Sequence, residues 1–299
     1  MDSSHLQRIT SSNRKRKAKN LMMVTCKRAE FMATFYPQNF SMPDSVIFYI
    51  AKNPKTAALY LKMVKTCKYF FVKNQIIVID CLDANRGKWS SRRLPLNLTK
   101  YNCKYWITDE IYAYAYEFVD KNIFSLIIPK LYQCDAKSLN LYSQVVYFND
   151  LSLLISSAEE ICLENVTVKK CDSVVPLEDI VAIAVKAKKI FVDKPIITSK
   201  TMKELTKLPN FAKLYSLTLH NLSEAFDIDV FYGYMKKNTR TKFYLNFDEQ
   251  ISEGYMNRLE TIIDEILETK QYNYKPAVIN FTGLDRHKHR YLCDICRSL

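Results

Sequence analysis

Six short segments with strand-like alternation recur through the second half of the chain. They cover residues 138–142, 160–164, 189–193, 216–220, 244–247 and 278–281. Their matched aliphatic residues are 22, 29, 27, 28 and 34 positions apart and are Leu139, Ile161, Ile190, Leu217, Leu245 and Ile279. Because side chains alternate between the two faces of a strand, we expect these residues to point into a core and their neighbours to point outward.

Helical segments separate these strands. They are expected at residues 149–158, 177–186, 199–207, 227–237 and 252–269, with capping signals at Asn149-Asp150, Ser199 and Ser252-Glu253. A strand-helix unit of this length resembles a leucine-rich repeat. The resemblance implies a curved solenoid in which neighbouring units stack and the strands line the concave side. A doubly wound α/β domain is the alternative fold, because it produces the same alternation.

Residues 40–72 have a different, helical pattern. Val46, Ile47 and Ile50 recur on one helical face, and Asn53-Pro54 ends that helix. A second helix is expected to follow, with two adjacent apolar rows: Leu59, Met63, Cys67 and Phe70 in one, and Tyr60, Val64 and Phe71 in the other. This apolar surface is wider than two short helices can bury on themselves, so another surface must cover it.

The segment resembles an F-box, the domain that connects a substrate receptor to a cullin-RING ubiquitin ligase. The residues that carry the resemblance are Met42-Pro43, the Val46/Ile47/Ile50 group and Cys67-Lys68-Tyr69-Phe70, although the family usually begins with Leu-Pro. The whole chain is similar in style to the large nematode families of F-box proteins. The resemblance implies docking to a Skp-type adaptor, and through it to cullin, by Met42, Pro43, Val46, Ile47, Ile50, Leu59, Met63, Val64, Cys67 and Phe70.

The fold expected from these patterns is of the α+β or α/β class, with a helical F-box-like module followed by an irregular leucine-rich-repeat-like strand-helix solenoid. The predicted domains are a disordered basic tail (1–30), the helical module (36–74), a connecting strand and helix region (75–135) and a target-binding repeat domain (136–299). Within the connecting region, residues 75–82 are expected to form a strand and 83–93 an exposed loop. The pattern of 122–129 fits either a strand or a short helix.

The basic tail holds much of the charge. Residues 1–28 contain eight basic residues and one acidic residue, a net +7 of the +13 carried by the whole chain. The cluster Arg14 to Lys19 fits a nuclear import signal, a nucleic-acid contact or a solvated tail. We expect deletion of this cluster to leave target binding by the folded domain intact. The expected location is the cytoplasm, the nucleus or both.

The repeat segments also select a target-binding face. The outward-pointing residues are Asn140, Tyr142, Glu160, Cys162, Glu164, Phe191, Asp193, Thr218, His220, Tyr244, Asn246 and Asn280. Tyr142, Phe191 and Tyr244 are the expected anchors, because large aromatic side chains most often dominate interface energies. The alternative for Phe191 is that it fills the space between neighbouring repeats.

Catalytic and cofactor chemistry has little support in the sequence. The chain contains four glycines and neither of the common phosphate-binding glycine motifs. His220 has no accompanying nucleophile motif. His287, His289, Cys293 and Cys296 are metal-ligand types, but a single helix cannot easily wrap a tetrahedral ion with all four, so a terminal capping helix is expected instead. We therefore expect no enzyme activity, no cofactor and no metal.

Compartment and partners follow from the remaining composition. Nine scattered cysteines are typical of a reducing compartment. The N-terminus is polar and basic, unlike a signal peptide. No apolar run approaches about 18 residues, so no membrane partner is expected. The function that combines these observations is a non-catalytic substrate receptor of an SCF-type ubiquitin ligase that binds a specific target protein. The alternatives are an interaction scaffold that recruits no ligase, and a nucleic-acid-associated protein that uses the basic tail.

Overall fold

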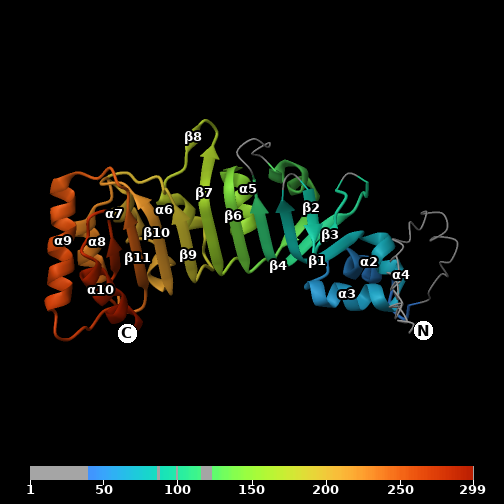
Figure 1. Ribbon diagram of the computed structural model, residues 1–299. Helices are drawn as coiled ribbons and strands as arrows, with labels where there is room; N and C mark the ends of the chain where they lie inside the picture. The colour runs from blue at the N-terminus through green and yellow to red at the C-terminus, as the bar shows by residue number, and fades with distance from the viewer. Residues whose placement is uncertain (1–39, 86–87, 99, 116–122, 299) are drawn as a thin grey trace, which may run out of the picture. The chain divides into compact units, whose positions relative to one another are not determined.

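A computed structural model of the 299-residue chain describes residues 40–85, 88–98, 100–115 and 123–298. The chain divides into two units, Met1–Asp44 and Ser45–Leu299. The predicted basic tail (1–30) and the Arg14 to Lys19 cluster lie outside the described residues. The second unit is a mixed α/β fold built on a largely parallel twelve-stranded sheet (Figure 1).

The strands are β1 (Ile76–Asn85), β2 (Lys88–Ser91), β3 (Leu94–Pro95), β4 (Lys104–Tyr114), β5 (Leu131–Cys134), β6 (Ser138–Tyr147), β7 (Glu160–Lys170), β8 (Ser173–Val174), β9 (Lys189–Asp193), β10 (Ser216–Leu222), β11 (Lys242–Phe247) and β12 (Val278–Asn280). The α-helices are α2 (Asp44–Lys52), α3 (Ala57–Thr66), α4 (Lys68–Lys73), α5 (Phe148–Ile155), α6 (Leu177–Ile183), α7 (Thr201–Leu205), α8 (Ile228–Met235), α9 (Glu253–Glu268) and α10 (Arg286–Ser298). Three 3-10 helices are η1 (Ile123–Leu126), η2 (Ile128–Lys130) and η3 (Phe211–Lys213).

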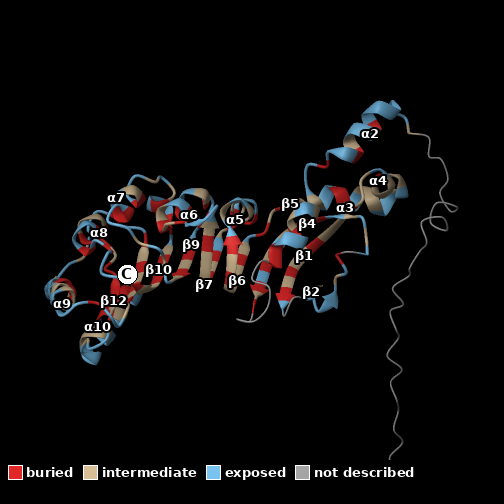
Figure 2. Cartoon of the chain, turned by 90° about the horizontal axis from the view of Figure 1, so that it is seen from above, coloured by how far each residue is buried: buried red, intermediate tan, exposed pale blue. Residues whose placement is uncertain are grey.

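The main parallel strands follow one another in chain order. β1, β4, β6, β7, β9, β10, β11 and β12 each pair in parallel with the next, while β5 joins β4 and β8 folds back on β7. The doubly wound alternative requires a point where the strand order reverses. The described strands contain no such reversal, and helices α5 to α9 lie along the same side of the strands (Figure 2).

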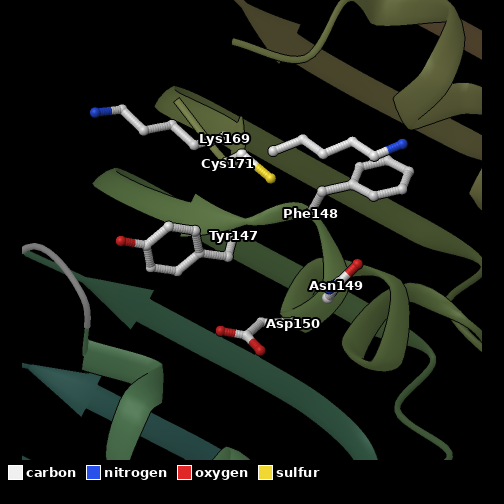
Figure 3. A pocket seen from close by; sticks show the side chains of 7 residues that line it. Tyr147, Phe148, Asn149, Asp150, Lys169 and Cys171 are labelled. Atoms are coloured by element: carbon white, nitrogen blue, oxygen red, sulfur yellow. The ribbon is translucent and has the colours of Figure 1, made fainter. Parts of the chain in front are cut away.

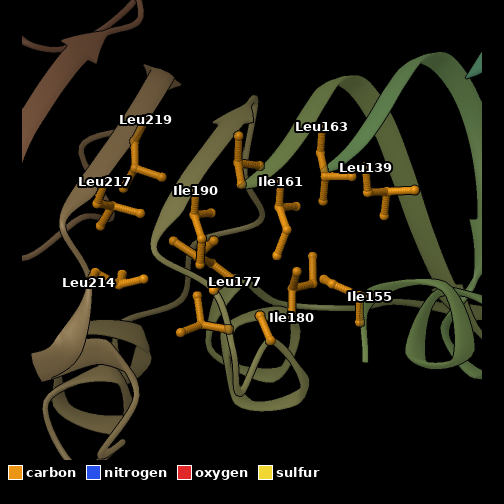
Figure 4. Packing of buried hydrophobic residues seen from close by; sticks show 14 of the residues in the cluster. Leu139, Ile155, Ile161, Leu163, Leu177, Ile180, Ile190, Leu214, Leu217 and Leu219 are labelled. Atoms are coloured by element: carbon orange, nitrogen blue, oxygen red, sulfur yellow. The ribbon is translucent and has the colours of Figure 1, made fainter. Parts of the chain in front are cut away.

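Aliphatic residues in register form the core between the sheet and these helices. Ile161 on β7 pairs with Ile190 on β9, which pairs with Leu217 on β10, and all three side chains are buried. Leu177 and Ile180 of α6 pack against them (Figure 4). Burying one such side chain contributes about 1.5–3 kcal/mol, so the repeated rows hold the sheet and its helices together.

All six predicted strands are present, but one register assignment was wrong. Leu217 pairs with Phe243, not Leu245, which is the partner of Leu219. The interval from Leu217 to its true partner is therefore 26 residues. Both Phe243 and Leu245 are apolar and point to the same face, so alternation alone could not choose between them.

The parallel series also begins earlier than predicted. Leu82 on β1 pairs with Ile111 on β4, and Ile111 pairs with Leu139 on β6. The intervals between these residues, 29 and 28 positions, match those of the later strands. The sheet thus continues without a break through the predicted connecting region (75–135) and across its boundary at residue 136.

Two other expectations for the connecting region are now resolved. Residues 83–93 were predicted to be an exposed loop, but they contain the end of β1 and all of β2, paired antiparallel. Trp89 of β2 is only 6% exposed and contacts Phe124 edge to face, with 5.9 Å between ring centroids. The buried indole anchors β2 to the core. Of the two alternatives for 122–129, the helical one is correct, since residues 123–130 form η1 and η2.

The five predicted helices between the repeat strands are present, although only one of the predicted caps is. The Ser252 hydroxyl accepts a hydrogen bond from the Tyr255 backbone N–H at 3.4 Å at the start of α9. The residues that cap α5 and α7 are Tyr147 and Lys200, and neither makes a side-chain capping bond. These helices are held by burial of their apolar faces rather than by their caps.

A left-handed residue recurs near the same point of four consecutive main strands. Ser143, Asn165, Lys194 and Asn221 have φ angles of 52 to 53°, and each lies four residues after a core residue of its strand. Asn221 also donates a hydrogen bond from Nδ2 to Asp193 Oδ1 at 2.5 Å on the adjacent strand. The repeat is therefore a repeat of backbone conformation as well as of side-chain pattern.

We expect Asn221→Ala to lower the free energy of unfolding by about 1–2 kcal/mol, because alanine loses the bond to Asp193 and disfavours positive φ. Asn221→Gly should cost less, because glycine adopts the same φ without strain. Chemical unfolding of both variants measures the difference. Equal losses would show that the backbone conformation contributes nothing.

Candidate functional site

Helices α2 to α4 carry seven of the ten predicted adaptor-binding residues, and α3 is anchored to the sheet. Tyr60 is buried in a cluster with Ile76 of β1 and Trp106 of β4. Its hydroxyl donates to the Asn74 carbonyl at 2.6 Å and accepts from the Ile76 N–H at 3.2 Å. Burial raises the pKa of Tyr60, so the phenol stays neutral.

The predicted second helix is two helices. Cys67 has extended backbone angles (φ −151°, ψ 128°) and separates α3 from α4. The expected continuous row from Leu59 to Phe70 is therefore interrupted. Met63 and Val64 of α3 are partly buried and pack against the Tyr60 cluster.

The predicted adaptor-binding residues fall into three groups. Ile47 (3% exposed) and Phe70 are buried. Four are half-buried: Ile50, Met63, Val64 and Cys67. Four are exposed: Met42, Pro43, Val46 and Leu59.

Sequence reasoning missed three apolar residues that are more available than most of the predicted set. Phe48, Tyr49 and Leu61 are exposed on α2 and α3, and Tyr49 is the most exposed at 68%. With Val46 and Leu59 they are the large apolar side chains that α2 and α3 expose, and we call this set the α2–α3 apolar surface. Helical periodicity could have identified Phe48 and Tyr49, because they do not lie on the same side of the helix as Ile47. In the structure α2 buries only Ile47 and Ala51.

The second candidate surface is the sheet face opposite α5 to α9, which we call the open face. Its residues form three rows across the strands, defined by the register of pairing. The first row is Cys81, Glu110, Ser138, Glu160, Lys189, Ser216 and Lys242. The second is Asp83, Tyr112, Asn140, Cys162, Phe191, Thr218, Tyr244 and Val278. The third is Asn85, Tyr114, Tyr142, Glu164, Asp193, His220, Asn246 and Asn280, and its register is interrupted between β7 and β9 and between β10 and β11.

All of the predicted target-facing residues lie in these rows, because the alternation was assigned to the correct faces. Phe191 and His220 contact each other edge to face, with 4.8 Å between ring centroids. Asn140 donates from Nδ2 to Glu110 Oε1 at 3.0 Å, and Asn280 donates to Asn246 Oδ1 at 3.2 Å. Contacts between neighbouring strands thus fix the orientation of polar groups on the open face.

A cluster of three tyrosines on the open face contains two residues that sequence reasoning missed. The ring centroids of Tyr112 and Tyr142 are 5.2 Å apart, and those of Tyr114 and Tyr142 are 6.3 Å apart. Tyr112 and Tyr114 belong to β4, which was not counted as a repeat strand. The alternation of Ile111 and Ala113 with these tyrosines, one interval before Leu139, was the signal that could have found them.

The C-terminal end of the open face is covered by α10. The Tyr244 hydroxyl lies 3.8 Å from Cys296 Sγ, and Lys242 Nζ donates to the Cys296 carbonyl at 3.2 Å. Val278, which pairs with Tyr244, is buried. Tyr244 was predicted to be a target-binding anchor, but its hydroxyl end is occupied by α10, so this assignment is weakened. α10 itself buries Leu292 and Cys296, as expected of a terminal capping helix.

Two of the cavities lined by described residues contain side chains with possible chemistry. One, of about 370 Å³, lies where β6 and β7 end and is lined by Tyr147, Phe148, Asn149, Asp150, Lys169, Lys170 and Cys171 (Figure 3). Burial raises the pKa of Asp150, and Lys170 Nζ lies 5.3 Å from the centre of the Phe148 ring. Cys171 is exposed at the rim of this lining.

The other cavity, of about 530 Å³, includes Tyr132, Gln133, Asp135 and Lys186 in its lining. Asp135 accepts hydrogen bonds from Trp106 Nε1 at 2.6 Å and from Gln133 Nε2 at 2.8 Å. These bonds satisfy the buried indole N–H, which gives the carboxylate a structural role. The described lining of this cavity, like that of the first, contains no histidine.

Within the described part of the chain, no group of three or more His, Cys, Asp or Glu residues is arranged to hold a metal ion. His289 Nε2 and Cys293 Sγ do lie 3.8 Å apart on α10. No helix among residues 40–85, 88–98, 100–115 and 123–298 is long and apolar enough to span a membrane. Comparison of the chain with protein-family models and with curated proteins finds no match.

Proposed function

We propose that this protein is a non-catalytic substrate receptor of an SCF-type ubiquitin ligase. Helices α2 to α4 dock a Skp-type adaptor, and the repeat sheet, arranged as a leucine-rich-repeat-like solenoid, holds a target protein on its open face. Ubiquitin transfer is then promoted by proximity, because the receptor raises the effective concentration of the target near a separately recruited conjugating enzyme.

The α2–α3 apolar surface is the observation that carries this proposal. Five large apolar side chains, two of them aromatic, are exposed on two neighbouring short helices: Val46, Phe48, Tyr49, Leu59 and Leu61. Exposed large apolar side chains are common in interaction sites, and aromatic residues often supply most of the binding energy. The surface coincides with the segment that resembles an F-box.

The arrangement of the sheet supports the target-binding part of the proposal. Parallel strands in chain order, helices on one face and a left-handed residue repeated at an equivalent position are features of stacked repeats. The opposite face between β1 and β10 is left to solvent and presents tyrosine, amide and carboxylate groups. Repeat proteins use such extended faces to bind other proteins.

One observation favours a second candidate, an interaction scaffold that recruits no ligase. Tyr60 of α3 is buried against Ile76 and Trp106, so part of the helical segment belongs to the core of the sheet domain. In this alternative the open face binds a partner, and α2 to α4 serve only to close the N-terminal end of the sheet. The two candidates differ in whether the α2–α3 apolar surface binds an adaptor.

The test is co-purification of the full chain with a co-expressed Skp-type adaptor, followed by affinity measurement. The double variant Val46→Asp/Tyr49→Asp should weaken adaptor binding by about 100-fold, because both charges would lose solvent in the interface. The fold should be retained, since both side chains are exposed.

The matched control is Val185→Asp/Tyr215→Asp, which changes another exposed valine and tyrosine away from α2 and α3. We expect this control to bind the adaptor as the parent does. A parent chain that recovers no stoichiometric adaptor, while still binding a target, would favour the scaffold. Equal affinities of both double variants would contradict docking through the α2–α3 apolar surface.

A further inference from the structure

The open face differs in charge from the rest of the chain. From β1 to β10 its three rows contain five carboxylates and one lysine, a net charge of −4, whereas the chain as a whole carries +13. The carboxylates are Asp83, Glu110, Glu160, Glu164 and Asp193. The lysine, Lys189, is already paired with Glu160 at 2.7 Å. None of the other four carboxylates forms an ion pair with a described residue.

Three of these carboxylates surround the tyrosine cluster. Asp83 pairs with Tyr112 across β1 and β4, and Glu164 pairs with Tyr142 across β6 and β7. Glu110 lies two positions before Tyr112 on the same strand and the same face. Carboxylates on β1, β4 and β7 therefore lie next to the phenol rings of β4 and β6.

The phenol of Tyr142 stays protonated in this setting. Burial, with contributions from Cys162, Tyr112 and Glu164, raises the pKa of Tyr142 to about 12. Tyr112 is 37% exposed, so part of its ring is open to a ligand. The cluster thus offers aromatic ring faces next to carboxylates.

Arginine has the chemistry that this arrangement would recognise. A guanidinium can stack on an aromatic ring and at the same time donate two parallel hydrogen bonds to a carboxylate. A lysine ammonium makes the charge interaction but is more strongly hydrated and lacks the planar fork. A phosphate backbone or an anionic membrane surface would be repelled by the same carboxylates.

We propose that the open face binds an arginine-containing cationic segment of a partner protein, with the tyrosine cluster and its neighbouring carboxylates as the recognition site. This inference rests on the proposed role of the open face in target binding, and it names the chemistry of the target. Charge complementarity steers the encounter, and stacking on Tyr112 and Tyr142 gives preference for arginine.

The experiment uses the full chain and a labelled peptide of alternating arginine and glycine, with lysine and glutamate analogues of the same length. Fluorescence anisotropy should show binding of the arginine peptide, at least about fivefold weaker binding of the lysine peptide and no binding of the glutamate peptide. Binding should weaken as salt is added, because the carboxylates are solvent-accessible.

The variant Tyr112→Ala/Glu164→Gln should reduce affinity for the arginine peptide at least about tenfold. The control is Tyr291→Ala/Glu268→Gln, which changes an exposed tyrosine on α10 and an exposed glutamate on α9. It should leave the affinity unchanged, and both variants should keep the thermal transition of the parent. Equal affinities of the two variants, or a preference for lysine over arginine, would overturn the inference.

The result is independent of adaptor recruitment. Binding of the arginine peptide that depends on Tyr112 and Glu164 supports the inference even if no adaptor co-purifies, in which case only the ligase proposal fails. The converse result is also informative. If Val46→Asp/Tyr49→Asp loses adaptor binding but the parent does not bind the arginine peptide, the ligase proposal stands and the inference about the open face fails. Displacement of the peptide from the parent by single-stranded RNA, but not by unlabelled arginine peptide, would also overturn it.

Discussion

Replacing Phe243 with alanine is expected to lower the free energy of unfolding by about 3–5 kcal/mol, the largest effect we expect from a single truncation. The Phe243 side chain on β11 is fully buried on the helix-covered face of the sheet. Its ring centroid lies 5.0 Å from that of Phe231, 6.3 Å from Tyr234 and 6.4 Å from Phe211. The substitution removes these contacts and leaves a cavity that α8 and η3 can fill only in part. Urea-induced unfolding measures the loss.

Phe191→Ala is the matched control, because it makes the same chemical change on β9 but on the open face. Phe191 is half-buried, and its ring contact is with His220. We expect it to cost about 1–2 kcal/mol, in proportion to the smaller area removed from water. If Phe191→Ala costs as much as Phe243→Ala, another part of the molecule must cover the open face in solution. That outcome would count against target binding there.

Ile47→Asp is the second substitution with a large expected effect, and it should unfold α2. Ile47 is 3% exposed, so the aspartate would be placed where water has little access to it. We expect the local stability of α2 to fall by about 3 kcal/mol or more. Hydrogen exchange of the α2 amides should report this loss.

Val46→Asp is the control at the adjacent position. Val46 is exposed, and a charge there should change stability by no more than about 0.5 kcal/mol. Unchanged exchange protection in Ile47→Asp would show that Ile47 is not buried in solution. The comparison also explains why adaptor binding should be tested at Val46 and Tyr49, since a loss of binding in Ile47→Asp would only report unfolding.

The faces of the repeat strands were readable from sequence because each strand is short and strictly alternating. Leu139, Ile161, Ile190 and Leu217 were assigned to the core, and all four are buried in mutual register. Burial of one face is the strongest constraint on a strand, since a slip of one residue would expose every core side chain. The same logic placed Asn140, Phe191 and His220 on the opposite face.

The register between strands and the first strand of the repeat series were harder to predict from the sequence. Phe243 and Leu245 are both apolar and both inward, so alternation is satisfied by either partner for Leu217. The choice depends on how α8 and η3 pack against the ring of Phe243. β4 was missed as a repeat strand because its aromatic residues obscured the alternation of Ile111 with Ala113, although it supplies two of the three tyrosines of the cluster.

The sequence by itself determined the strand-helix alternation and the inward and outward faces of the repeat strands. It also determined the Ser252 cap and the presence of helices near residues 44–73. Each of these features depends on residues close together in the chain. Only the tertiary structure decided that Ile47 is buried while Tyr49 is exposed, that Tyr60 belongs to the core of the sheet and that α10 covers Tyr244. These outcomes depend on contacts between residues as far apart as Tyr60 and Trp106, or Tyr244 and Cys296. A periodic pattern states that a face must be covered, but the segment that covers it is chosen by packing across the whole sheet.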